Sequence, residues 1–437
     1  MNWQQQYQER ICSPEQAIER CVHSGDTIYG GGATVAVTCL NALFAHIDSG
    51  QLSGIHLSMN GPCNPGLKLD QYHFSREQLI FPAMFLNPPD RYLMGKQLCC
   101  YLPLQFGMYN RYIEAIDPDV AIIIMSPPDE EGYCCVGPYG FVPEPLAKCR
   151  RLIAQVSRHI PRINGTSHRV HVSRMDAIVE ADDLMTVMES TRPVTAVEER
   201  IAQHILEHIH DGACIQLGIG GIANAVGYGL RGMRHLGIHS EVLTDSIVEL
   251  VKSGVVDNSR KGFWPRVSAI GFVLGSQMQN EFIADNSAFR FGRFDEIVNI
   301  ANIAANEQMI SINAAIAVDL TGQVCAESIG HRQYSGTGGQ LDFVRGASLS
   351  KGGCSFIALP STVETKAGRS SRIVFEFAPG SVITTPRTDV QYVVTEYGCV
   401  KLMFCDVCER VRRMISIAHP DYREELTYQA RRAGLLL

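Results

Sequence analysis

The stretch TAVEERIAQHILEHIHDGACIQLGIGGIANAVGYGL, residues 195–230, decides the fold because the chain uses its plan twice. The other copy is SPEQAIERCVHSGDTIYGGGATVAVTCLNALFAHI, residues 13–47. Each copy runs from an amphipathic helix through a glycine turn into a short apolar strand, and a glycine-rich loop then leads into a second helix. A repeated unit of this kind predicts two related α/β halves.

Both copies open with the pattern of a capping box. In this motif, a hydroxyl before the helix and an acid or amide three residues later each accept the other's backbone N–H. Ser13 and Gln16 supply the pair in the first copy, and Thr195 and Glu198 supply it in the second. The pattern therefore predicts that a helix begins directly after Ser13 and another directly after Thr195.

Near-continuous apolar runs elsewhere are typical of parallel strands covered on both faces. They lie at residues 120–126, 177–181, 355–361 and 390–397. A polar stretch around residues 185–197 is the expected linker. We therefore predict an α/β fold of two structurally similar halves with mostly parallel sheets, divided into residues 1–188 and 189–437.

The composition is that of a globular protein of enzyme size. The chain has 437 residues, of which 46% are hydrophobic and 19% charged, and its net charge is −7. The acidic balance argues against a partner that is nucleic acid or an anionic membrane. The chain has no apolar run of 18 residues, and its first residues lack the apolar core of a signal peptide, so we expect a cytoplasmic protein.

The 15 cysteines are expected to be reduced thiols in that compartment. Cys405 and Cys408 form a C-x-x-C motif, but further ligands at zinc-site spacing are not evident. Apolar residues from Val400 to Met414 recur in approximate helical phase, which predicts that both cysteines lie inside a helix. We therefore interpret the motif, and the vicinal pairs at 99–100 and 134–135, as structural.

A carboxylate interrupts one predicted strand. Glu241 lies in GIHSEVLTD, residues 237–245, among residues that favour a strand. The first copy carries GIHLSMNG at residues 54–61, where Ser58 takes the equivalent place. The repeated frame therefore does not itself require a carboxylate, which favours a functional role for Glu241.

The glycine loops fit anion binding, because glycine allows backbone N–H groups at a helix start to approach a ligand. One interpretation is dinucleotide binding: Gly218, Gly220 and Ala223 satisfy G-x-G-x-x-A after a strand, and Glu241 follows at about 20 residues, where the ribose acid lies in that fold. A glycine turn that only packs a helix on a strand is the plainer alternative. A second cluster, residues 334–347, has no role in either interpretation.

Taken together, several segments resemble the acetyl-CoA hydrolase/transferase family of class I coenzyme A-transferases, most closely the 4-hydroxybutyrate CoA-transferase type. The resemblance covers essentially the whole chain. It departs from the family at residues 399–408, where a small, basic, glycine-containing stretch is usual. The segments that carry it are SPPDEEGYC (126–134), LGIGGIANAV (217–226), GIHSEVLTD (237–245), SINAAIAVDLTGQVCAESIG (311–330), SGTGGQLDFVRGA (335–347), TTPRTDVQYVVTEYG (384–398) and ISIAHPDYREEL (415–426).

The resemblance implies two similar α/β halves and a catalytic glutamate at Glu241. It implies coenzyme A and acyl-CoA as substrates together with short-chain carboxylates such as acetate and 4-hydroxybutyrate, no tightly bound cofactor, no metal, and a homodimer. It also implies that ten residues contact coenzyme A or the acyl group: Gly218, Ile219, Gly220, Gly221, Ile222, Asn299, Gly336, Gly338, Gly339 and Lys351.

A carboxylate nucleophile explains such chemistry, because attack of Glu241 on an acyl-CoA leads through an anhydride to a glutamyl-CoA thioester that an acceptor acid can reopen. Three other functions stay open: acyl-CoA hydrolysis on the same fold, dinucleotide-dependent oxidation, and coenzyme A binding without turnover.

Other titratable residues near these motifs have alternative interpretations. Glu327 is the strongest rival nucleophile, because it lies close to the second glycine cluster. His239, two residues from Glu241, is expected to be structural, because His56 occupies the same place in the copy without the glutamate. Asp342 and Arg345 are expected to brace a loop as a pair, and Asp129 with Glu130 is expected to form a solvated turn.

Overall fold

The computed structural model describes residues 2–60, 64, 66–138, 148–165, 168–185, 192–274, 276–366 and 368–436. The chain forms two compact units, one of Met1–Glu189 with Ile270–Asp295 and one of Ser190–Ala269 with Glu296–Leu437. Compared with a division at 188/189, Glu189 and the segment Ile270–Asp295 also belong to the first unit.

The first unit is built on a sheet whose strands pair in the order β4-β3-β2-β1-β5-β7-β9, and every pairing in it is parallel. Strand β5 is buried along its whole length, as expected for a strand covered on both faces. The strands are β1 (Thr27–Gly32), β2 (Ile55–Asn60), β3 (Leu79–Ala83), β4 (Cys99–Tyr101), β5 (Val120–Met125), β7 (Arg151–Val156) and β9 (Ala177–Glu180).

Short helices alternate with these strands. They are α1 (Trp3–Arg10), α2 (Pro14–Cys21), α3 (Val37–Asp48), α4 (Pro88–Gly95) and α5 (Tyr109–Ile116). The small antiparallel pair β6 (Tyr133–Cys135) and β8 (Arg169–His171), helix α10 (Gln277–Ile283) and strand β13 (Phe289–Phe291) also belong to this unit. Strand β12 (Ser268–Val273) and helix α11 (Phe294–Ile297) include the residues where the chain passes between units.

The second unit contributes six neighbouring strands in the order β11-β10-β14-β19-β23-β24. The pairings from β11 to β23 are parallel, and β24 runs antiparallel to β23. The strands are β10 (Cys214–Leu217), β11 (Gly237–Leu243), β14 (Met309–Ala314), β19 (Cys354–Ala358), β23 (Tyr392–Thr395) and β24 (Gly398–Lys401).

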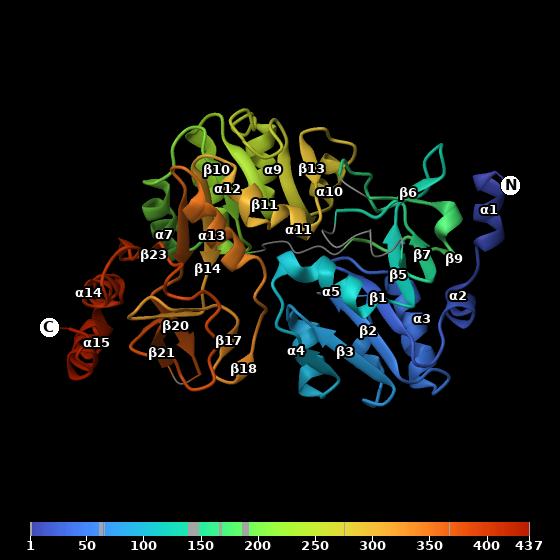
Figure 1. The fold of residues 1–437 in the computed structure, drawn as a ribbon, viewed down its shortest axis with the longest axis horizontal. Helices are drawn as coiled ribbons and strands as arrows, with labels where there is room; N and C mark the ends of the chain where they lie inside the picture. Colours follow the sequence, from blue (N-terminus) through green and yellow to red (C-terminus); the bar gives the residue numbers. More distant parts are fainter. Residues whose placement is uncertain are drawn as a thin grey trace. The chain divides into compact units, whose positions relative to one another are not determined.

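Helices pack on this sheet, with α13 against β14 and β19 and α7 against β23. Figure 1 shows α14 and α15, drawn in red at the C-terminal end, packed together. The helices are α7 (Ala196–Leu206), α8 (Gly221–Gly229), α9 (Asp245–Lys252), α12 (Ile300–Ala304), α13 (Gln340–Leu349), α14 (Val407–Ile417) and α15 (Pro420–Arg432). Short strands complete the unit: β15 (Ala317–Asp319), β16 (Val324–Cys325), β17 (Ser328–Ile329), β18 (Arg332–Gln333), β20 (Thr362–Thr365), β21 (Gly368–Ser371) and β22 (Ile373–Val374).

The internal repeat and the α/β class are confirmed. Both capping boxes form, the first at Ser13 with Gln16 and the second at Thr195 with Glu198. In each copy the first helix leads to a strand that pairs in parallel with the next strand of the chain, β1 with β2 and β10 with β11. The four apolar runs at 120–126, 177–181, 355–361 and 390–397 correspond to β5, β9, β19 and β23.

The prediction that Cys405 and Cys408 share a helix is wrong. Val400 belongs to β24, and α14 begins only at Val407, with Asp406 as its N-cap. Cys405 therefore precedes the helix and Cys408 lies in its first turn. Strand pairing at the edge of the sheet outweighed a helical phase carried by few apolar residues. Both thiols are free, and the described residues contain no cluster of three or more metal-ligating side chains.

Phe404, which precedes this motif, adopts a left-handed backbone conformation with φ +66° and is 94% exposed. That conformation costs an L-residue about 1–2 kcal/mol, whereas glycine adopts it freely. Glycine also increases the conformational entropy of the unfolded chain, which offsets part of this gain. We therefore expect Phe404→Gly to raise the free energy of unfolding by roughly 0.5–1 kcal/mol in denaturant or thermal melts. Phe404→Ala removes the ring but keeps the conformation, so it should stay within about 0.5 kcal/mol of the native chain. Equal gains in both variants would rule out backbone strain as the cause.

Candidate active site

Strand β11 carries Glu241 to the edge of the sheet where its parallel strands end. The strand pairs with β10, and the hydroxyl of Ser240 donates to the carbonyl of Leu217 at the end of β10, 3.1 Å away. The neighbouring residues of β11 are buried, whereas Glu241 keeps part of its surface accessible. Thr244 then caps helix α9 and ends the strand. Local pairing and capping thus fix the position of the carboxylate.

The carboxylate of Glu241 lies against the start of α13. Gly339 is the N-cap residue of that helix, and its backbone N–H donates to the Glu241 carboxylate. A Cβ added to Gly339 would overlap Oε2 of Glu241, so the contact requires a glycine here. A helix N-terminus carries partial positive charge, which suits a carboxylate at this point.

Two neighbouring carboxyl groups share this environment. The pKa of Glu241 is raised to about 8, first by burial and then by the nearby carboxylate of Asp342, whereas the Gly339 N–H opposes both effects. Burial likewise raises the pKa of Asp342 to about 7, against the attraction of Arg345. Both acids thus hold their protons to higher pH than exposed acids, as is common at functional sites.

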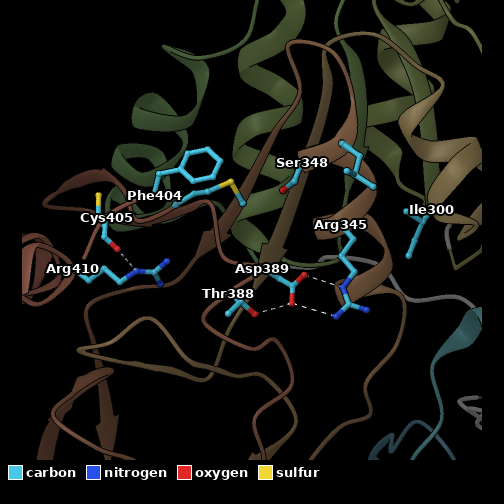
Figure 2. Close-up of a pocket in the computed structure, with 10 residues that line it drawn as sticks. Ile300, Arg345, Ser348, Thr388, Asp389, Phe404, Cys405 and Arg410 are labelled. Carbon is cyan, nitrogen blue, oxygen red and sulfur yellow. Dashed lines mark hydrogen bonds and ion pairs between the residues drawn. The ribbon is translucent and has the colours of Figure 1, made fainter. Parts of the chain in front are cut away.

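Asp342 and Arg345 do not form the bracing pair that the sequence suggests. Nε of Arg345 donates to Oδ1 of Asp389 at 2.9 Å, and Nη2 donates to Oδ2 at 3.3 Å. Figure 2 shows the guanidinium turned to Asp389. Oδ2 of Asp342 is buried and has no hydrogen-bond partner among the described residues. The sequence did not reveal that Asp389, 44 residues away from Arg345, competes for the cation.

His239 has both ring nitrogens engaged. Nε2 lies 2.7 Å from the carbonyl of Ile297, and the side-chain amide of Asn306 lies 2.9 Å from Nδ1. These partners assign the proton to Nε2 and make Nδ1 the acceptor. Burial first, and then Lys261, lower the pKa of His239 to about 3. The ring is therefore neutral and serves the packing of β11, in agreement with the expectation from the repeat.

Lys261 lies beside this histidine and was missed in the sequence, which offers no motif around it. Its ammonium donates to the carbonyls of Ile238 and Val267 at 2.6 and 2.7 Å. Burial lowers the pKa of this side chain to about 8.

Glu327, the rival nucleophile, is occupied in holding the second glycine cluster. Its side chain accepts from Gln333 at 3.0 Å and from the hydroxyl of Thr337 at 3.4 Å. Its backbone carbonyl accepts the N–H groups of Tyr334 and Ser335. The residue therefore shapes the loop that delivers Gly339 to Glu241.

The turn at Asp129 matches its expected structural role, because the Asp129 carboxylate accepts the backbone N–H groups of Glu131 and Tyr133.

The first glycine loop lies at the same sheet edge. It follows β10 and opens α8, whose N-cap is Gly220 with φ +119° and no side-chain hydrogen bond. Ile219 in this loop is 52% exposed. The loop Gly218–Ile222 thus leaves the first backbone N–H groups of α8 without a side-chain cap. Gly338 and Gly339 precede Gln340, whose side chain donates to the carbonyl of Ala314 at the end of β14, 2.9 Å away.

Asn299 and Lys351 have separate local contacts. The side chain of Asn299 caps α12 by accepting from the backbone of Ala301 and Asn302. Its chain neighbour Val298, rather than Asn299 itself, packs at Gly339. Lys351 is exposed and pairs with Glu307 at 3.0 Å. Lys351 follows the C-terminal end of α13, whereas Gly339 precedes the N-terminal end. Because ten helical residues span about 15 Å, the length of this helix separates the two residues.

A cavity of about 680 Å³ opens along the C-terminal part of α13 (Figure 2). Its lining is mostly apolar, with Arg345 and Asp389 on one side and Phe404 on the other. Ten residues line it: Ile300, Arg345, Ser348, Leu349, Thr388, Asp389, Met403, Phe404, Cys405 and Arg410.

Comparison with known proteins decides the family. Residues 1–189 match the acetyl-CoA hydrolase/transferase N-terminal domain, and residues 275–430 match the C-terminal domain of the same family. The chain belongs to the acetyl-CoA hydrolase/transferase family. In this structure Glu241 lies within β11 against Gly339, so the G-x-G-x-x-A spacing does not require a dinucleotide.

Similar proteins include two that are named as CoA transferases. The chain is 38% identical to succinyl-CoA:cyclohexane-1-carboxylate CoA transferase of Geobacter metallireducens, over 99% of this chain and 97% of the other. It is 36% identical to 4-hydroxybutyrate coenzyme A transferase of Clostridium kluyveri, over 98% of each. The crystal structure of RipA from Yersinia pestis superimposes with a TM-score of 0.91 at 32% identity, covering all of both chains. Among the described residues, no helix of this acetyl-CoA hydrolase/transferase family member is long and apolar enough to cross a membrane.

The raised pKa of Glu241 predicts a pH-dependent effect on stability. The folded protein binds this proton more tightly than the unfolded chain, where a glutamate has a pKa of about 4.3. The stabilising contribution is therefore complete below that value and is lost as pH rises through about 8. We expect Glu241→Gln to raise the melting temperature by a few degrees at pH 9 and to change it little at pH 5. Glu364→Gln, at an exposed position, is the control. A gain that is the same at both pH values would contradict the assignment.

Proposed function

We propose that this protein transfers coenzyme A between a short-chain acyl-CoA and a free carboxylate through a covalent glutamyl-CoA intermediate at Glu241. One observation carries the proposal: the carboxylate lies at a sheet edge, bonded to the Gly339 N–H at a helix start. Family membership and the transferase titles of the relatives support the same reaction class.

The reaction balances in four displacements, the last two of which reverse the first two with the acceptor acid in place of the first acid. The Glu241 carboxylate attacks the acyl carbon, the carbon–sulfur bond breaks, and coenzyme A leaves as thiolate from a mixed anhydride. The thiolate then attacks the Glu241 carbonyl carbon and releases the first acid as its carboxylate, which leaves a glutamyl-CoA thioester. The acceptor carboxylate attacks this thioester, and the same steps run in reverse to give the new acyl-CoA.

Each displacement builds negative charge on a carbonyl oxygen. The Gly339 N–H, and that of Gly338 with φ +60°, are the proposed donors to that oxygen. The uncapped start of α8, at Gly218–Ile222, is proposed to bind coenzyme A through its backbone N–H groups. Asn299, Gly336 and Lys351 remain proposed contacts of coenzyme A or the acyl group.

The acid pair is proposed from the relatives. Their names include succinyl-CoA, cyclohexane-1-carboxylate, 4-hydroxybutyrate, butyryl-CoA and acetate as substrates. We propose 4-hydroxybutyrate and acetate as the pair to assay first, with succinyl-CoA as an alternative donor.

The covalent intermediate is the decisive test. We expect rapid digestion after incubation with acetyl-CoA or succinyl-CoA to show the mass of coenzyme A, less one water, on the peptide that contains Glu241. Glu241→Ala should abolish both the adduct and the transfer of coenzyme A to a carboxylate. An adduct on the Glu327 peptide, or normal transfer by Glu241→Ala, would overturn the placement. Release of free coenzyme A at equal rates with and without a carboxylate would instead identify a hydrolase.

The glycine contact gives a second prediction. Gly339→Ala should lower the rate of coenzyme A transfer by about 10²–10³, because the added methyl group displaces the Glu241 carboxylate and disturbs the N–H donor. The backbone of Gly339, φ −99°, accepts alanine without strain, so the effect is steric. Gly232→Ala is the matched control, since a Cβ there meets nothing within 4 Å. Equal rates for the two variants would remove Gly339 from the mechanism.

A further inference from the structure

We propose that Asp342 is a positioning residue for Glu241: it is the capping-box acid of α13, displaced from the Gly339 N–H by the nucleophile and kept beside it as a second negative charge. The inference rests on the proposed function of Glu241. It assigns to Asp342 a role in the reaction rather than in bracing a loop.

Other helices of the chain show what this position ordinarily does. In a capping box the third helical residue accepts the N–H of the N-cap residue. Asp90 does so in α4, where Oδ2 accepts from Asn87 at 2.7 Å. Glu198 does so in α7, where Oε2 accepts from Thr195 at 2.9 Å. The third residue of α13 is Asp342.

In α13 this bond is replaced. The N–H of Gly339 donates to Glu241, which reaches it from β11. Asp342 is 8% exposed, and its Oδ2 has no partner among the described residues. A buried carboxylate oxygen without a partner is costly, because desolvation is not compensated by a hydrogen bond. The fold thus retains an unfavourable acid beside the nucleophile.

Arg345 attracts the charge of Asp342 but does not pair with it, so the repulsion is compensated only in part. Arg345, the cation nearest in sequence to Asp342, is held by Asp389, with the guanidinium turned to that carboxylate in Figure 2. Lys261 is bonded to the carbonyl of Ile238 in β11 and to that of Val267, directly before β12, and His239 is neutral. Two effects oppose the ionisation of Glu241: burial, and the charge of Asp342, which is the one described group with this effect.

The consequence for the reaction follows from charge. Two ionised carboxylates so close repel, which makes Glu241 a more basic and more nucleophilic anion. Once Glu241 is acylated or holds coenzyme A, it is neutral and the repulsion disappears. Asp342 therefore raises the energy of the ionised nucleophile relative to the covalent intermediate.

The pH profile of adduct formation tests this role. Attack requires ionised Glu241, so the rate of adduct formation should rise with pH through about 8, which gives the pH profile a rising limb. Asp342→Asn keeps the shape and removes the charge, so this limb should move to lower pH by about one unit or more, and the rate above the limb should fall. Asp90→Asn, at the same helix position of α4, is the matched control and should leave the limb in place.

A crystal structure of a second variant tests the same role even if Asp342→Asn fails to fold. In a Glu241→Ala structure we expect Asp342 to turn and accept the Gly339 N–H at about 2.7–3.2 Å, completing the capping box. A native-like Asp342→Asn with an unmoved limb, or an unmoved Asp342 in Glu241→Ala, would overturn the inference. If the native chain forms no adduct on Glu241, it is the proposed function that fails.

Discussion

The hydrogen bond from the Gly339 backbone N–H to the Glu241 carboxylate is the interaction on which the site depends. It joins a strand to the start of a helix almost 100 residues later in the chain. It also explains why the helix start must be glycine, because a side chain there would occupy the space of the carboxylate. The helix dipole and the N–H stabilise the anion, whereas burial and Asp342 oppose it. The balance of these effects sets the reactivity of Glu241.

The repeat places this constraint in one half of the chain. Both copies fold as a capped helix, a strand and a glycine loop. In the first copy, Ser58 on β2 pairs beside β1 in the same kind of parallel arrangement. The two copies therefore share a scaffold, and the second differs by the carboxylate on β11 and the helix start that faces it.

Particular residues show how far the sequence could predict the structure. Capping boxes, apolar strands and the repeat depend on neighbours within a few residues, and these predictions were confirmed. The helical phase from Val400 to Met414 failed, because pairing of β24 with β23 determined the conformation of the first part. The Asp342–Arg345 pair failed for a similar reason, since Asp389 from a distant loop binds the arginine.

The sequence by itself determined the α/β class, the two related halves, the family resemblance and the choice of Glu241 as candidate nucleophile, because each follows from local patterns or from motifs repeated along the chain. Only the tertiary structure decided what acts on that carboxylate. The contact of the Gly339 N–H with Glu241, and the burial of Asp342 Oδ2 without a partner among the described residues, arise where segments distant in sequence meet. Burial and charge act through space, so their effect on Glu241 depends on packing that local patterns do not encode.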